Sequence, residues 1–419
     1  MSNKRPLACK DSNSPAPPST KRLLRGAHGE PTTPAPGRAL PVDLLLEIAA
    51  RADVVTLVRC AAASKPLRRD ILDPAFRRRR HASVAAGGLA DFDPALLLGI
   101  SYRLHDTKTR SAASATAHVV GTPPSPRPRV RVDHDVLQSF DPVASRDGLL
   151  VLRSHGSRVR DLLSVCDTFT GDVTSLPPAL VSGSYPPALL TVGADRSFEL
   201  LVANSLPALE IQIFSSKNGR WGAVRAVRHT LQLMLVSHEP PVVLGRTVHR
   251  LAQKSFLDPP HILALDVAAE VTTTVQLPSG YRDKISPAIF GCTVLLAAVG
   301  GRLSLFVAER RAVSLWSLTT SMPAPAWSRK VVIGLQEIER QSGLHALRSP
   351  GTFLAFGERS GNLIVRMNSG EVIRINYGNK EATTLCKYED KGRKWISHVF
   401  LHEVDLASLL QAMKSFRSD

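Results

Sequence analysis

Few residues in this sequence have the types and spacing that chemistry requires. Asp133-His134-Asp135 brings together two carboxylates and an imidazole, the groups that bind metals or transfer protons. Three adjacent side chains in an extended segment point to alternating faces, so we interpret this triplet as a surface turn. His238-Glu239 and His402-Glu403 are pairs without a second histidine at helical spacing. The sequence therefore predicts no metal site and no cofactor.

The motifs of common enzyme classes are also absent from the sequence. It contains no G-x-S-x-G nucleophile motif, no H-E-x-x-H zinc motif and no glycine-rich phosphate-binding or dinucleotide-binding loop. No C-x-x-C pair occurs among the five cysteines, which predicts reduced thiols rather than a disulfide or zinc framework. The cysteines are Cys9, Cys60, Cys166, Cys292 and Cys386. We expect a protein without catalytic activity of its own.

Composition predicts a chain of two or three domains without a membrane span. The sequence has 419 residues, of which 43% are hydrophobic, enough for a substantial core. No apolar run reaches the ~18 residues that a membrane helix needs. The N-terminus is polar and basic and lacks the apolar segment of a secretory signal. We therefore expect a cytoplasmic or nuclear location, or both.

The net charge of +17 is concentrated at the front of the chain. Residues 1–80 hold sixteen Lys/Arg and seven Asp/Glu, which gives +9. Single-stranded nucleic acid is usually bound by basic residues interleaved with aromatic ones. Aromatic residues make up only 5% of the chain, and the basic run Arg77–Arg80 contains none. We do not expect nucleic acid as a partner.

Residues 40–80 show a helical pattern. Leu40, Leu44, Leu45 and Ile48 recur at helical spacing, and Pro41 fits a first turn, where no hydrogen bond is lost. A second helix is expected after Asp53, with Val54, Leu57, Val58 and Ala61 on its apolar face, and a third after Ser64. About forty residues bury little surface alone, so this unit is expected to lean on a partner or a neighbouring domain.

This pattern resembles the F-box. The matching features are Leu40-Pro41, the Leu44-Leu45…Glu47-Ile48 helix, Leu57 to Cys60, Ser64-Lys65 and Asp73 to Phe76. Leu67 stands where many F-boxes carry a tryptophan. The resemblance implies docking to a Skp-family adaptor of a cullin–RING ligase. The adaptor contacts that it implies are Leu40, Pro41, Leu44, Leu45, Ile48 and Leu57. The alternative is an ordinary helical subdomain packed on the rest of the chain.

From Val136 to Glu403 the sequence predicts an all-β domain. Short runs rich in Val, Leu, Ile and Phe are separated by Gly, Asn, Asp and Pro. A weak repeat aligns at Asp167, Ser215, Asp266, Glu309 and Asn368, with spacings of 48, 51, 43 and 59 residues. This spacing is typical of the ~40–50-residue blades of a β-propeller, and Trp221 or Trp316 after a strand is kelch-like. We expect five or six blades; a β-sandwich is the alternative.

The remaining segments complete the predicted domain organisation. Residues 1–39, rich in Pro, Ser, Lys and Arg, are expected to be a disordered basic tail, with a nuclear import signal as the alternative. Residues 81–135 are expected to be a linker with short elements. Residues 404–416 are expected to form a helix that packs on the last blade, with Leu406, Leu409, Leu410 and Met413 on one face.

An F-box followed by a β-domain resembles the large plant F-box family, especially grass-type members with a kelch-like or F-box-associated domain. The segments Ser139–Leu150 and Val242–His249 add to this resemblance. It implies a substrate-receptor subunit of an SCF-type ubiquitin ligase, in which the F-box binds the adaptor and the β-domain binds a target protein. The alternative function is a non-catalytic propeller scaffold with no link to ubiquitination.

Overall fold

The computed structural model describes residues 40–52, 54–73, 75–76, 92–106, 116–121, 131–154, 162–181, 185–193, 195–204, 209–228, 234–235, 240–253, 261–281, 294–319, 326–345, 347, 350–387 and 394–406. The chain divides into two compact units, Met1–Pro41 and Val42–Asp419. The predicted tail at 1–39, the arginine run and most of the predicted C-terminal helix lie outside the described residues.

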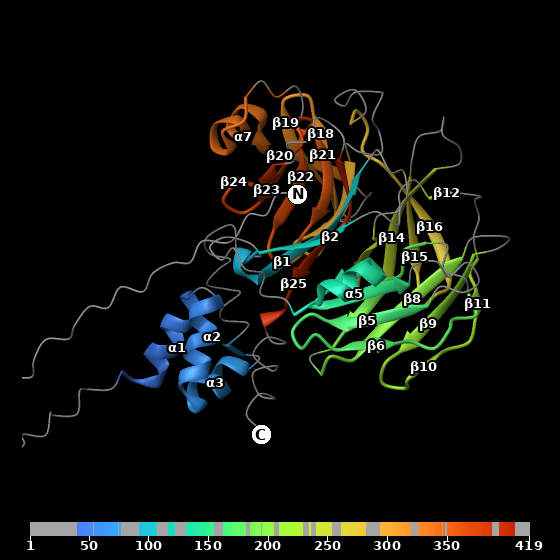
Figure 1. The fold of residues 1–419 in the computed structure, drawn as a ribbon, viewed down its shortest axis with the longest axis horizontal. Coiled ribbons are helices and arrows are strands. Elements are labelled where there is room, and N and C mark those ends of the chain that lie inside the picture. The colour runs from blue at the N-terminus through green and yellow to red at the C-terminus, as the bar shows by residue number, and fades with distance from the viewer. Residues whose placement is uncertain are drawn as a thin grey trace, which may run out of the picture. The chain divides into compact units, whose positions relative to one another are not determined.

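Three short helices follow residue 41: α1 (Val42–Arg51), α2 (Val54–Ala63) and α3 (Lys65–Leu72) (Figure 1). Ser64 caps α3, since its hydroxyl oxygen accepts a hydrogen bond from the Leu67 backbone N–H at 3.4 Å. Leu406 packs against the core between these helices, so the segment after the last strand contacts the helical unit. The buried residues of that core are Ala49, Ala50, Leu57, Ala61, Leu67, Ile71 and Phe76.

The described strands form six sheets (Figure 1). Five of them follow one another along the chain. The first consists of β3 (Phe140–Arg146), β4 (Leu149–Ser154), β5 (Leu163–Asp167) and β6 (Val173–Ser175). The second consists of β7 (Ala188–Val192), β8 (Phe198–Asn204), β9 (Glu210–Ser215), β10 (Arg220–Trp221) and β11 (Arg225–Ala226). The third consists of β12 (Met234–Leu235), β13 (Val242–Leu244), β14 (Thr247–Gln253), β15 (His261–Asp266) and β16 (Val271–Gln276). The fourth consists of β17 (Val294–Val299), β18 (Arg302–Glu309), β19 (Ala312–Thr319) and β20 (Ala326–Gly334). The fifth consists of β21 (Thr352–Phe356), β22 (Asn362–Arg366), β23 (Glu371–Asn376) and β24 (Ala382–Lys387). The short helix η1 (Pro94–Leu96) precedes the first strand, and the helices α5 (His134–Ser139) and α7 (Leu335–Ser342) lie between strands.

The sixth sheet joins the two ends of the β-domain. Its order is β2-β1-β25, with β1 (Leu97–Asp106), β2 (Thr116–Val120) and β25 (Lys394–Glu403). We call it the closing sheet, because β25 from the end of the chain pairs with β1 from before residue 131. The predicted linker at 81–135 therefore contains two strands of the propeller, and the predicted boundary at 136 lies too late in the chain.

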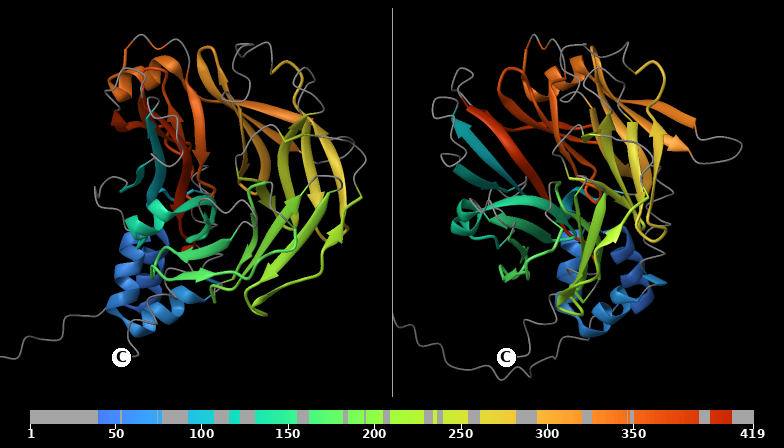
Figure 2. Two further views of the ribbon diagram at one scale, coloured as in Figure 1. Left: turned by 45° about the vertical axis from the view of Figure 1, so that its right-hand side comes forward. Right: turned by 90° about the vertical axis from the view of Figure 1, so that its right-hand side faces the viewer.

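The inner strands of the six sheets form a closed ring. In turn, β3 contacts β7, β7 contacts β13, β13 contacts β17, β17 contacts β21, β21 contacts β25, and β25 contacts β3. Figure 2 shows the sheets following one another in chain order, from green through yellow and orange to red. This arrangement is a six-bladed β-propeller, and the β-sandwich alternative is wrong. A single twisted sheet cannot bury both faces, but a ring of sheets buries them against each other.

The apolar cores lie between neighbouring blades. One core combines residues of β3–β5 with residues of β7–β9, including Val151 and Leu200. In β13, Val243 packs toward the preceding blade and Val242 toward the following one, as alternation along a strand requires. Each blade is therefore stabilised mainly by its neighbours.

Two tryptophans tie the edges of adjacent blades together. The Trp221 indole N–H donates to the carbonyl oxygen of Pro177 at 2.6 Å, and Trp327 donates to that of Gln276 at 3.0 Å. Both acceptors are next to the leucine of the repeated Leu-Pro pair at 176–177 and 277–278. Of the two tryptophans that were predicted to follow a strand, Trp221 ends β10, whereas Trp316 lies within β19.

Candidate functional site

The first candidate site is the exposed side of α1. Leu44 and Ile48 stand one turn apart and are 51% and 58% exposed, and Val42 is 48% exposed. On the opposite side of α1, Ala49 and Ala50 are buried against α2 and α3. This helix therefore has apolar residues on two faces, and only one of them is covered within the described chain.

The other predicted adaptor residues differ in exposure. Leu45 is half-buried and packs on the helical core. Leu57 is completely buried there, so its side chain is not available to a partner, and its role is to hold the helices together. Leu40 is 54% exposed and Pro41 is exposed in the unit 1–41.

The residues with possible chemistry do not gather at one place. Asp133 caps α5 by accepting a hydrogen bond from the Asp135 backbone N–H at 3.0 Å. Burial raises the pKa of the Cys166 thiol to about 11, helped by repulsion from Asp167 and Asp172, so this thiol stays protonated at neutral pH. Within the described ranges, no three His, Cys, Asp or Glu side chains could share a metal ion. The predicted pair His238-Glu239 lies outside those ranges.

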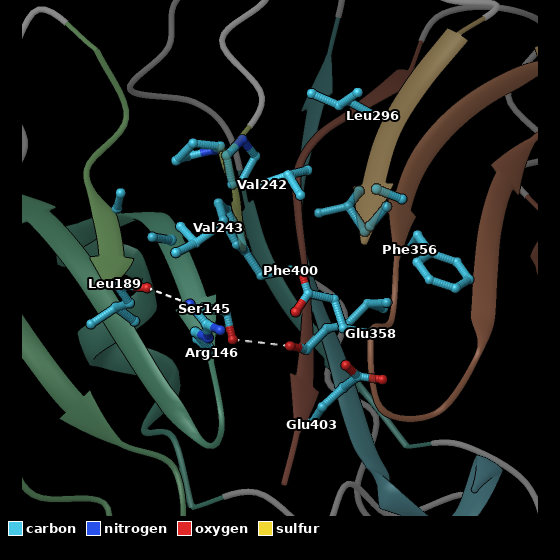
Figure 3. A pocket seen from close by; sticks show the side chains of 18 of the residues that line it. Ser145, Arg146, Leu189, Val242, Val243, Leu296, Phe356, Glu358, Phe400 and Glu403 are labelled. Atoms are coloured by element: carbon cyan, nitrogen blue, oxygen red, sulfur yellow. Dashed lines mark hydrogen bonds between the residues drawn. The ribbon is translucent and has the colours of Figure 1, made fainter. Parts of the chain in front are cut away.

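A second candidate site, which the sequence did not reveal, lies where the six inner strands meet. A cavity of about 140 Å³ is lined by residues from or beside all six of these strands (Figure 3). We call it the channel cavity. Val242, Val243, Leu296 and Phe356 form its apolar wall, and its charged end carries Arg146, Asp147, Glu358, Arg359 and Glu403.

The two arginines of the charged end are already engaged in the fold. Arg359 binds Asp147 through two hydrogen bonds, Nε to Oδ1 at 3.0 Å and Nη2 to Oδ2 at 3.3 Å. Arg146 donates from Nη1 to the backbone carbonyls of Leu189 and Leu190 at 2.9 and 3.2 Å. Its Nε lies 3.9 Å from Asp147 Oδ2. These contacts join residues of three blades, so both arginines contribute to holding the fold together.

The two glutamates of the charged end have perturbed acidities. Burial raises the pKa of Glu403, although its carboxylate accepts hydrogen bonds from the backbone N–H groups of Arg359 and Ser360 at 3.1 and 2.8 Å. Glu358 is reached by water, yet surrounding protein atoms remove much of its hydration and raise its pKa to about 7. The Glu403 and Asp147 charges add to this rise, and Arg146 opposes it.

The signal for this cluster in the sequence is faint. Arg146-Asp147 lies at the end of the inner strand β3, and Glu358-Arg359 follows the inner strand β21; both pairs are next to a glycine. Each pair alone resembles an ordinary polar turn. Only the ring of inner strands brings them next to Glu403, so the site could not be located before the blade order was known.

Comparisons with known proteins add a family but no activity. A protein family described as Domain of unknown function (DUF7595) matches residues 99–416. No curated protein matched the sequence. None of the described helices has the length and apolar character needed to cross a bilayer.

Several solved structures are similar at low identity. TolB from Acinetobacter baumannii is 12% identical, with a TM-score of 0.43, over 78% of this chain and 72% of that one. A putative TolB from Agrobacterium tumefaciens is 14% identical, with a TM-score of 0.38, over 72% and 98%. A fungal alcohol oxidase of the AA5 family, in complex with copper, is 12% identical, with a TM-score of 0.35, over 60% and 53%. These likenesses are too distant to carry a functional argument.

Proposed function

The chain belongs to the DUF7595 family, a domain of unknown function, and we propose that it is the substrate-receptor subunit of an SCF-type cullin–RING ubiquitin ligase. In this proposal α1–α3 are an F-box that binds a Skp-family adaptor, and the propeller binds a target protein in the cytoplasm or nucleus. The chain performs no covalent chemistry. It holds the target near a ubiquitin-loaded enzyme and so raises the effective concentration of the target.

The observation that carries this proposal is the uncovered apolar face of α1. An apolar pair one helical turn apart, exposed on a helix whose other face is buried, favours a partner that covers it. Leu44 and Ile48 form that pair, with Val42 beside them. Leu40 and Pro41 remain adaptor contacts predicted from the sequence, and Leu57 supports the site from inside the helical core.

The expected size of the effect follows from burial. Covering one leucine or isoleucine side chain contributes about 1.5–3 kcal/mol. Truncating both Leu44 and Ile48 to alanine should therefore cost about 3 kcal/mol or more, which is ~100-fold or more in the dissociation constant.

The test is a binding titration of the purified full chain with a recombinant Skp-family adaptor. The Leu44→Ala/Ile48→Ala variant should bind at least about 100-fold more weakly than the unmodified chain. Leu180→Ala is the matched control, because Leu180 is a 76% exposed leucine of the β-domain. This control should bind as the unmodified chain does.

The alternative is a propeller that binds proteins without any ligase. The six-bladed ring is compatible with it, because the fold offers loop surfaces whatever the helices do. If the unmodified chain does not bind the adaptor, the ligase proposal fails and this reading replaces it.

A further inference from the structure

The channel cavity has room for one short ligand group. Its volume of about 140 Å³ corresponds to roughly four or five water molecules at ~30 Å³ each. Val242, Val243 and Leu296 give it an aliphatic wall, and carboxylates stand at its other end (Figure 3). A cavity with these two zones fits an aliphatic stem that ends in one polar group.

The sign of the charge on that group follows from the charges around the cavity. Two guanidinium groups, from Arg146 and Arg359, face three carboxyl groups, from Asp147, Glu358 and Glu403. Arg359 is paired with Asp147, and Arg146 donates from Nη1 to two backbone carbonyls, so both guanidinium groups already have partners within the protein. Glu358 loses its proton above pH ~7, and when all five groups are ionised one negative charge is in excess, which favours a cationic ligand.

Glu358 is the group that a cation would meet. Among the described residues, none donates a hydrogen bond to its carboxylate, whereas Glu403 and Asp147 both have donors. Burial is the main cause of the raised pKa of Glu358, and the charge of Arg146 offsets part of that rise. A cation that donates a hydrogen bond in the cavity would give this carboxylate the donor that the described residues do not provide.

We infer that the channel cavity binds a primary ammonium or guanidinium group carried on a short aliphatic stem. The charged head pairs with Glu358, next to Glu403, and the stem lies against Val242 and Leu296. Such a group is found on small free amines and on the lysine or arginine side chain of a bound protein. This inference does not rest on adaptor docking, because none of these residues belongs to α1–α3.

The test is a titration of the full chain, above pH ~7 so that Glu358 is ionised, with n-butylammonium and n-butylguanidinium, and with butyrate as the anionic counterpart. Both cations should bind, and butyrate should bind at least about tenfold more weakly. Glu358→Gln keeps the size of the side chain and removes its charge, so it should weaken cation binding about tenfold or more. Asp172→Asn, which removes an exposed carboxylate outside the cavity, should leave it unchanged.

A second comparison in the unmodified chain keeps the test valid if the Glu358→Gln variant does not fold. Butylammonium should bind several-fold more tightly than methylammonium, since the longer stem buries more apolar surface against the wall of the cavity. Equal binding of the two ammonium ions would contradict the aliphatic part of the site.

Peptides distinguish the two sources of the ligand group. An acetylated, amidated Gly-Lys-Gly peptide that binds as well as butylammonium would support the site and identify a protein side chain as its ligand. Binding of butylammonium without the peptide would support the site and indicate a free amine. The inference is overturned if neither cation binds, if butyrate binds as well as they do, or if Glu358→Gln binds them unchanged.

Discussion

Acidification should destabilise the propeller through His402. This side chain of β25 is completely buried, faces Gly99 across the closing sheet, and has no hydrogen-bond partner for either ring nitrogen among the described residues. Burial lowers its pKa from 6.5 to about 4. The folded protein therefore keeps His402 neutral over a pH range in which the unfolded chain protonates it.

The sign and size of the effect follow from this difference. Protonation of His402 favours the unfolded chain. The contribution of neutral His402 to the unfolding free energy is therefore fully present above pH ~6.5 and is lost as the pH falls toward ~4. One pKa unit is worth about 1.36 kcal/mol, so the loss is ~3 kcal/mol in total and ~2 kcal/mol by pH 5. Glu403 works in the opposite direction, because burial raises its pKa and its protonation favours the folded state.

A His402→Leu variant separates this effect from the other titrating groups. Urea unfolding followed by tryptophan fluorescence reports on the β-domain alone, since all four tryptophans lie in it. The unfolding free energy of the unmodified chain, minus that of the variant, should fall by about 2 kcal/mol between pH 7 and pH 5. If this difference in unfolding free energy does not change with pH, His402 has the same pKa in the folded and unfolded chain, and the reasoning is refuted.

Two further predictions concern the propeller scaffold. Gly351→Ala should lower the unfolding free energy by more than ~2 kcal/mol, because Gly351 has φ +88° and a Cβ there would collide with the Arg366 carbonyl oxygen. Gly219→Ala is the control and should lower it by only about 1 kcal/mol, because Gly219 has φ +63° but open space around the added Cβ. Equal costs in urea unfolding would contradict the close approach at Gly351. Trp327→Phe should cost about 1 kcal/mol through loss of its hydrogen bond to the Gln276 carbonyl in the preceding blade, and a stability unchanged from the unmodified chain would argue against that tie.

Local signals in the sequence were sufficient for individual hairpins. The pairs Asn218-Gly219 and Ser369-Gly370 are typical of hairpin turns, and Gly219 and Gly370 have positive φ angles between β9 and β10 and between β22 and β23. The side chains of Asp167, Asp266 and Asn376 each accept backbone hydrogen bonds in the turn after the third strand of a blade. The conformation of a turn depends on residues that are adjacent in the sequence, so a single sequence is enough to predict it.

The predicted repeat matches the blades only in part. Asp167, Ser215 and Asp266 end the third strand of their blades, but Glu309 ends a second strand and Asn368 follows one. Successive strands of a blade have similar apolar sequences, so a local pattern cannot tell the second strand from the third. The predicted repeat is therefore one strand out of register in the blades β17–β20 and β21–β24. No local pattern reveals the closing sheet, since the pairing of β1 with β25 joins residues about three hundred positions apart.

The two candidate sites differ in how far the sequence could define them. The period of α1 placed Leu44 and Ile48 on one side of a helix, but no periodicity distinguishes a face that packs inside from one that stays exposed. The F-box resemblance predicts Leu57 as a contact of the partner, but this side chain is buried. The channel cavity draws its carboxylates from separate turns and a strand end, which only the closed ring brings together.

The most direct test of the adaptor-docking claim is hydrogen–deuterium exchange of the full chain with and without a recombinant Skp-family adaptor. The account predicts slower exchange in α1, where Leu44 and Ile48 are exposed, and unchanged exchange in the inner strands of the propeller. Unchanged exchange in α1 at saturating adaptor, or protection confined to the β-domain, would contradict docking through this helix.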